Sequence, residues 1–274
     1  MKIQFLQACR TQFKAVCVST TFIFVALATF NVNAQVARTP DGKPDINGIW
    51  QAMGSAHWNL EAHNASAGPV PSLGAIGAIP GGLGVVEGGK IPYKPEALKR
   101  KQENQANWLE LDPVAKCFLP GVPRATYLPH PFQIIQSPGT MLITYEFAGA
   151  DRIVHMDKAD FAAPVESWMG HNLGHWEGDT LVIKVTDQRE ETWFDSAGNY
   201  HGYELVVEER YTPAGPNVLM YEATITDPEF YTKPWKISMP LYRRLDQNMQ
   251  LLDFKCVEFV EEKLYGHLRK KKAE

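Results

Sequence analysis

The chain has 274 residues, and its 27 lysines and arginines against 31 acidic residues give a formal net charge of −4. An acidic chain argues against nucleic acid as a partner, because that partner requires a basic face. The C-terminal run "LRKKKAE" is basic, but a short lysine run at a chain end is usually a solvated tail.

Residues 1–34 have the features of a secretory signal peptide. Basic residues precede an apolar stretch over 15–30, and the tripeptide that ends at Ala34 fits a small-residue cleavage site. An uncleaved anchor is the alternative, although the stretch is short for a membrane span. Cleavage leaves 274 − 34 = 240 residues with a charge of 24 − 31 = −7. We therefore expect a periplasmic or secreted protein that starts at Gln35 and does not associate with a membrane.

Cleavage would also remove two of the four cysteines, Cys9 and Cys17. The remaining two, Cys117 and Cys256, are expected to form a disulfide in an oxidising compartment, tying the segment before the main domain to its last strand. A catalytic thiol is the alternative.

Three elements are expected between residues 35 and 110. A first strand contains Asn47–Trp50, a Gly/Pro-rich flap without steady periodicity covers 64–92, and one short helix covers 95–108, with proline at its start. Together with residues 111–274 they are expected to form one domain.

From residue 111 onward the sequence predicts an antiparallel β-barrel. Short runs rich in Val, Ile, Thr, Tyr and Trp alternate with turn residues, and no helices alternate with them. The predicted strands lie near 132–137, 140–147, 151–156, 171–176, 180–186, 203–211, 217–226, 235–243 and 249–258.

The Gly-x-Trp at Gly48–Trp50 resembles the opening of lipocalin-like barrels, in which a basic side chain lies over the tryptophan. Arg243, Arg244 or Lys255 could fill that role through a cation–π contact. A barrel of this size can hold one small ligand. The predicted fold class is therefore an all-β, lipocalin-like antiparallel barrel.

The segment 167–185 contains two histidines, His171 and His175, and could be a metal site or a hairpin. Paired histidines four apart bind zinc on a helix, but the glycines around them disfavour a helix. On a strand the two would be about 13 Å apart, at ~3.3 Å per residue, too far to share one ion. We therefore predict a hairpin about 177–179, with Gly178 at positive φ and Asp179 bonded to backbone, and no metal.

Several blocks resemble those of a family of exported bacterial proteins, mostly of unassigned function, found in proteobacteria and acidobacteria. They are "RTPDGKPDINGIW", "DPVAKCFLPGVPR", "HPFQIIQSPG", "ITYEF", "WMGHNLGHWEGDTLVI", "TWFDSAGNYH", "VEERY" and "TITDPEFYTKPW". The resemblance implies an exported β-rich domain and fixes no activity. After "RIVHMD" such proteins continue with Gly-Arg and then His-Pro, whereas this chain reads "KADFAAPVE". The polar residues that recur in the family's blocks correspond to Arg124, Tyr145, Arg152, Asp157, His171 and His201.

Two of these residues are expected to face the barrel interior. Tyr145 falls in an apolar alternating set, where its hydroxyl could hold a ligand oxygen, donate a proton or simply pack. Arg152 would need a partner or an anion, and Glu146 or Asp157 is the expected partner. A purely structural ion pair is the alternative.

Histidines supply the acid–base candidates, because imidazole titrates near neutral pH. His155 would pair with Asp157 if both face inward, and His201 is expected in a loop at the barrel mouth. We hypothesise that the four predicted catalytic side chains converge on one cavity inside the barrel. They are Tyr145, Arg152, His155 and His171. The predicted substrate-binding residues are Arg124, Asp157, Trp168 and His201.

The sequence lacks a nucleophile motif, a phosphate loop and a dinucleotide fingerprint, so no cofactor is expected. The favoured function is a cofactor-independent enzyme that performs proton transfer on a small, largely apolar molecule, as a lyase or isomerase. The alternatives are a non-catalytic periplasmic carrier with the same cavity and a structural envelope module. A homo-oligomer is left open. Polar groups that converge in the cavity would favour the enzyme. An apolar lining would favour the carrier, and a filled barrel without a cavity would favour the structural module.

Overall fold

The computed structural model describes residues 36–159, 161, 163–257 and 266–268. The predicted signal peptide therefore lies outside the described residues. In the part of the chain that is described, no helix has the length and apolar character needed to cross a membrane.

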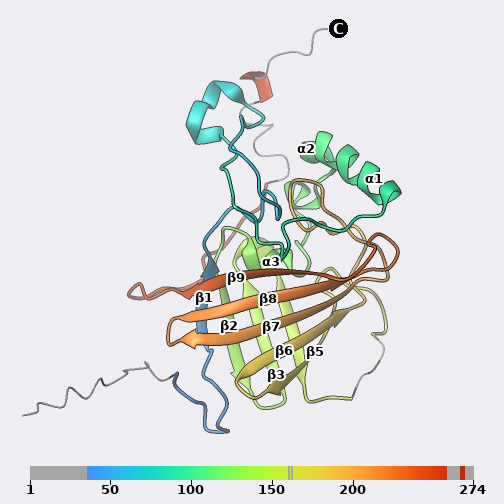
Figure 1. Ribbon diagram of the computed structural model, residues 1–274. Helices are drawn as coiled ribbons and strands as arrows, with labels where there is room; N and C mark the ends of the chain where they lie inside the picture. The colour runs from blue at the N-terminus through green and yellow to red at the C-terminus, as the bar shows by residue number, and fades with distance from the viewer. Residues whose placement is uncertain (1–35, 160, 162, 258–265, 269–274) are drawn as a thin grey trace, which may run out of the picture. The chain divides into compact units, whose positions relative to one another are not determined.

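Nine strands in the described residues form one closed barrel, shown in Figure 1. Each strand pairs with the next along the chain, and β9 returns to pair with β1. This confirms the predicted all-β barrel. The strands are β1 Gly48–Ala52, β2 Phe132–Ser137, β3 Thr140–Tyr145, β4 Asp151–Met156, β5 His171–Glu177, β6 Thr180–Thr186, β7 Val206–Gly215, β8 Val218–Thr226 and β9 Trp235–Arg243.

Two details differ from the sequence expectation. Strands β4 and β5 are parallel, so the sheet is mixed rather than wholly antiparallel. The connection over 157–170 is long enough for the crossover that a parallel pair requires. Residues 249–257 of the predicted last strand contain no strand, because β1 already occupies the free edge of β9 and closure leaves no edge for another strand. Cys256 accordingly lies beyond the last strand.

Barrel closure is reinforced at Trp50, which is buried on β1. The Arg243 guanidinium lies 4.3 Å from the centre of the Trp50 ring. The same guanidinium donates to the main-chain oxygens of Asn47 and Pro216. Of the three basic side chains proposed from the sequence, Arg243 therefore makes the cation–π contact over the tryptophan.

The helices belong mainly to the long connection between β1 and β2. The predicted helix appears as α1 Pro95–Ala106, followed by the short α2 Trp108–Leu111 and α3 Arg124–Tyr127. The 3-10 turns are η1 Pro71–Gly77, η2 Pro113–Lys116, η3 Phe147–Gly149 and η4 Gly266–Leu268. In Figure 1, α3 lies against one end of the barrel and α1 and α2 lie beyond that end.

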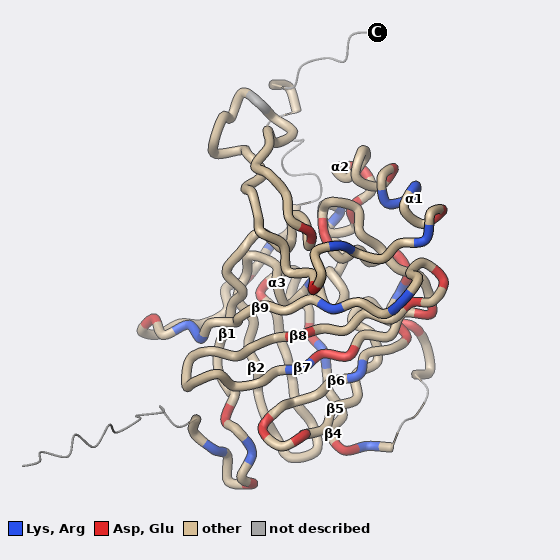
Figure 2. The backbone as a smooth tube through the Cα atoms, viewed as in Figure 1, with Lys and Arg blue, Asp and Glu red and all other residues tan. Residues whose placement is uncertain are grey.

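The Gly/Pro-rich flap is a ribbon held together by isolated bridges between His63 and Gly82 and between Ser66 and Ile79. Its base is anchored where Val86 bridges to Ile237 on β9. No charged residue occurs from Asn64 to Val86, and this ribbon has neither red nor blue in Figure 2. Charged residues gather instead on α1 and on the loops beside it.

The disulfide between Cys117 and Cys256 is present, with the two Cα atoms 5.6 Å apart. It joins the β1–β2 connection to the segment that follows β9, which has no regular secondary structure over 244–257. A second anchor for this segment is the Leu252 amide, which donates to Glu146 Oε2 at 2.9 Å. The C-terminal segment is thereby fixed at the same end of the barrel as α3.

The predicted hairpin joins β5 to β6 in antiparallel register, with Glu177 opposite Thr180. Gly178 has a φ of +59°, as the turn requires. Asp179 departs from its expected role, because its carboxylate accepts two hydrogen bonds from Arg38, at 2.9 and 2.8 Å. The turn therefore ties the N-terminal segment to the barrel.

Replacing Gly178 with valine should lower the free energy of unfolding by roughly 1–2 kcal/mol, because an L-residue with a branched Cβ resists positive φ. No atom lies within 4 Å of the position of a new Cβ, so the effect would come from the backbone alone. Gly178→Asn is the matched control, since asparagine tolerates this conformation. Urea unfolding of the three proteins measures the difference. Equal midpoints for the valine and asparagine variants would contradict the turn assignment.

Candidate functional site

The interior of the barrel contains a buried ion pair between Arg152 on β4 and Glu209 on β7. Tyr211 and Tyr221 both donate to Glu209 Oε1, at 3.0 and 2.8 Å. All four side chains are buried. The expected partners of Arg152, Glu146 and Asp157, are therefore wrong, because the counter-charge comes from the opposite wall of the barrel.

Tyr145 lies inside the barrel beside this cluster, as its alternation predicted, and is 2% exposed. Its hydroxyl is 3.4 Å from Thr126 Oγ1 on α3. Burial raises the pKa of Tyr145 above its ordinary value, although the charge of Arg152 opposes the shift. Burial by itself would lower the pKa of Arg152, but Glu209 raises it, so the guanidinium stays charged. Both carboxylate oxygens of Glu209 are hydrogen-bonded in this cluster, whereas Nε and Nη1 of Arg152 are buried and make no hydrogen bond to a described residue.

The hypothesis that four catalytic side chains converge inside the barrel is wrong. On β4, Arg152 points inward while His155 belongs to the outward-facing set, and on β5 the outward set includes His171. The rings of His155 and His171 lie 5.8 Å apart, and Phe161 packs edge-on against both. Because successive side chains of a strand alternate between faces, no repacking brings His155 to Arg152.

Two predicted substrate-binding residues also lie on the outside. Asp157 is exposed in the turn after β4, with a φ of +51°, and is therefore not the inward-facing partner of His155. Trp168 stacks on Phe118 with ring centres 4.9 Å apart and is contacted by the Arg189 guanidinium. Both belong to the connection between β4 and β5.

His201 lies in the connection between β6 and β7, but it is buried rather than open at a mouth. Its Nδ1 is 2.9 Å from the oxygen of Gly202, and its Nε2 is 2.6 Å from Thr192 Oγ1. A neutral ring that donates from Nδ1 and accepts at Nε2 satisfies both contacts. Burial lowers the pKa of His201 to about 4, which keeps the ring neutral at pH 7.

Arg124, one of the predicted substrate-binding residues, lines a pocket. It is buried at the start of α3 and forms a double hydrogen bond with Asp112, both distances being 2.7 Å. Asp112 is also the N-cap of η2, where it accepts from the Val114 amide. Ser196 Oγ donates to Asp112 at 3.0 Å and accepts from Arg124 at 3.1 Å. This triad joins three separate segments at the end of the barrel.

The pocket above this triad has a volume of about 770 Å³. Trp58 and Trp108 form one aromatic pair on its wall, with ring centres 5.7 Å apart. His130, Phe147 and Phe254 form a second group, in which Phe254 lies 4.9 Å from each of the other two rings. Most of the wall comes from the β1–β2 connection, and the disulfide-bound C-terminal segment completes it.

His57 also lines the pocket. Its Nδ1 is buried and makes no hydrogen bond to any described residue. Burial lowers the pKa of His57 to about 4, and the positive charge of Arg124 adds to the shift. The ring is therefore neutral at pH 7 and can serve a ligand as hydrogen-bond donor or acceptor, depending on its tautomer.

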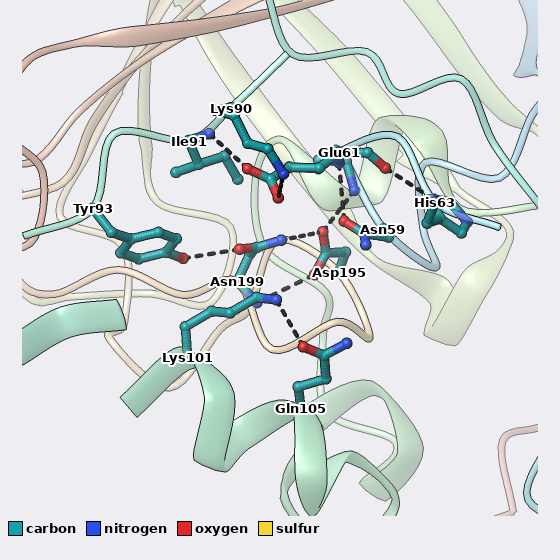
Figure 3. A network of polar contacts seen from close by, with 11 residues as sticks. Asn59, Glu61, His63, Lys90, Ile91, Tyr93, Lys101, Gln105, Asp195 and Asn199 are labelled. Carbon is teal, nitrogen blue, oxygen red and sulfur yellow. Dashed lines mark hydrogen bonds and ion pairs between the residues drawn. The ribbon is translucent and has the colours of Figure 1, made fainter. Parts of the chain in front are cut away.

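A polar network next to Ser196 holds this end of the molecule together (Figure 3). Asp195 accepts from the Leu60 amide at 2.8 Å and from Asn199 Nδ2 at 2.6 Å. Tyr93 donates to Asn199 at 3.1 Å. Burial raises the pKa of Asp195 to about 6 despite these hydrogen bonds. The network links the base of the flap to the β6–β7 connection, and so positions Ser196 and His57.

Sequence reasoning missed four residues that matter here: His57, Asp112, Ser196 and Glu209. Alternation along β7 would have placed Glu209 inside with Val207 and Tyr211. The other three lie in irregular connections and carry no periodic signal. Among the described residues, no group of three or more His, Cys, Asp or Glu side chains is arranged to hold a metal ion.

Comparison with known proteins adds no family assignment. No family model matches the chain, and no match was found among curated proteins or solved structures.

Replacing Glu209 with glutamine should destabilise the protein by about 3–5 kcal/mol, because it leaves the buried charge of Arg152 without a partner. The double variant Arg152→Met with Glu209→Gln removes both charges and should be more stable than the single variant. Chemical denaturation measures both. A single variant within about 1 kcal/mol of the wild type would contradict the ion-pair assignment.

The two buried histidines should make stability fall as the pH is lowered from 6.5 to 4. Their folded pKa values of about 4 lie below the ordinary value of 6.5, so the unfolded chain binds more protons in this window. Asp195 acts in the opposite direction between its ordinary 3.8 and about 6, because its folded form holds the extra proton. His201→Gln should reduce the slope of the unfolding free energy against pH by up to about 1.4 kcal/mol per pH unit. Unfolding free energies of the wild type and the variant, measured between pH 6.5 and 4, test this prediction. The same slope for both proteins would contradict it.

Proposed function

We propose that this protein is an exported carrier that binds a small, largely apolar molecule in the pocket at the end of the barrel. The observation that carries the proposal is the pocket itself, about 770 Å³ in volume and walled by two groups of aromatic rings. Ligand sites in proteins typically have volumes of about 300–1,000 Å³ and apolar walls with a few polar groups. Export is part of the proposal, supported by the N-terminal segment of the sequence and by the disulfide.

A carrier fits the electrostatics of the pocket better than an enzyme does. A general base works best when its pKa is near the operating pH, and the pKa of His57 is about 4. Arg124 and Ser196 are engaged with Asp112. Inside the barrel, Arg152 and Tyr145 are packed in the core. These residues therefore have structural roles, and none of them is suited to transfer a proton at neutral pH.

A proton-transfer enzyme is the second candidate, because His57, Asp112, Arg124 and Ser196 converge on the same pocket. A ligand that replaces one of the contacts among these residues would change the pKa values of the others and so allow acid–base chemistry. A bound compound recovered unchanged in mass and isomeric form after long incubation favours the carrier. A converted compound favours a lyase or isomerase.

The binding proposal can be tested with N-phenyl-1-naphthylamine, whose fluorescence rises in apolar surroundings. The wild type should bind it, and Ala115→Trp, which places a large ring in the pocket, should weaken binding at least about tenfold through steric overlap. Ala214→Trp is the matched control, because Ala214 is exposed in the β7–β8 hairpin and does not line the pocket. Thermal unfolding checks that both variants fold. Equal binding by both variants, or none by the wild type, would contradict the proposal.

A further inference from the structure

Building on the proposed ligand pocket, we infer that its ligand is an uncharged molecule and that organic anions are excluded, although an arginine lines the wall. An arginine in a pocket is commonly the residue that receives a carboxylate or phosphate, through the paired N–H groups of its planar fork. Here Nη1 and Nη2 are already occupied, and Nε is buried and makes no hydrogen bond to a described residue.

The guanidinium of Arg124 uses Nη1 and Nη2 on Asp112, at 2.7 Å each, and Nη2 also reaches Ser196. The Arg124 and Asp112 side chains are each 2% exposed. A carboxylate entering the pocket would have to displace Asp112 from this double hydrogen bond, leaving Asp112 buried without its counter-charge. Such a buried unpaired charge costs several kcal/mol, so the exchange is unfavourable.

The remaining charges of the wall also balance. The lining contains two acids, Glu110 and Asp112, and two bases, Arg124 and Lys255. Lys255 is 79% exposed and pairs with Asp253 at 2.9 Å, so it contributes little field to the interior. The pocket therefore offers no net positive charge to an anion and no net negative charge to a cation.

The wall offers an uncharged ligand a polar contact at His57 and the two groups of aromatic rings for stacking. His57 lines the pocket beside Trp58, with ring centres 5.4 Å apart. Its Nδ1 is buried, so a ligand would meet another part of the imidazole ring. A neutral imidazole can hydrogen-bond a carbonyl, ester, ether or hydroxyl oxygen without introducing a charge. The class of ligand is thus an apolar, ring-bearing molecule with one or a few neutral oxygens.

Three naphthalenes of similar size test the inference by isothermal titration calorimetry at pH 7. They are 2-acetylnaphthalene, 2-naphthoate and 2-naphthylmethylammonium. The ketone should bind at least about tenfold more tightly than either ion, and Ala115→Trp should abolish the difference by closing the pocket. A carboxylate or ammonium that binds as tightly as the ketone would overturn the inference while leaving the pocket as a ligand site. No binding by any of the three would refute the proposed function itself.

A charge variant provides the sharper test. Asp112→Asn keeps the capping oxygen but frees the charge of Arg124, so the affinity for 2-naphthoate should rise at least about tenfold relative to the affinity for the ketone. Ser196→Ala is the matched control, because it removes a neighbour of the same pair and leaves the charges balanced. An Asp112→Asn variant that folds and gains no affinity for naphthoate would overturn the inference. If that variant does not fold, the affinities of the three ligands for the wild type still show whether the pocket prefers an uncharged ligand.

Discussion

Pairing of β1 with β9 closes the barrel and thereby sets the arrangement of the segments around it. β1 has five residues, Gly48–Ala52, and is separated from β2 by a connection that runs to Phe132. Its pairing with both β2 and β9 removes the two edges that an eight-strand sheet would expose. The contact of Arg243 with Trp50 strengthens the seam. Closure also fixes both ends of the long connection, and so holds it against one end of the barrel.

That connection supplies most of the pocket, which is therefore a feature of the barrel's end and not of its interior. The triad of Arg124, Asp112 and Ser196 joins the connection to the β6–β7 segment. The disulfide from Cys117 to Cys256 brings the C-terminal segment to the same place. Segments without periodic structure thus form a defined wall, because covalent and buried polar links replace the hydrogen-bond ladders that order a sheet.

Polar groups inside and outside the barrel have different roles. Arg152 and Glu209 neutralise each other in the core, where Tyr211 and Tyr221 also donate to Glu209, because a buried charge that remains ionised needs a counter-charge. The neutral ring of His57, by contrast, lines the pocket. A charge pair enclosed in the core contributes to the fold, whereas an ionisable residue with a shifted pKa beside a cavity is a better candidate for ligand contact.

The barrel, most strand positions, the 177–179 turn and the pairing of Cys117 with Cys256 could be predicted from the sequence, because they depend on local periodicity, turn chemistry and a small number of cysteines. Alternation along Asp151–Met156 already predicts that Arg152 and His155 lie on opposite faces of the strand, which conflicts with the hypothesis that both enter one cavity. Only the tertiary structure decided that β4 and β5 run parallel, that Glu209 neutralises Arg152, and that Asp112 occupies Arg124. These pairings join residues distant in the chain, and the two-residue period of a strand gives the face of a side chain but not its partner across the barrel.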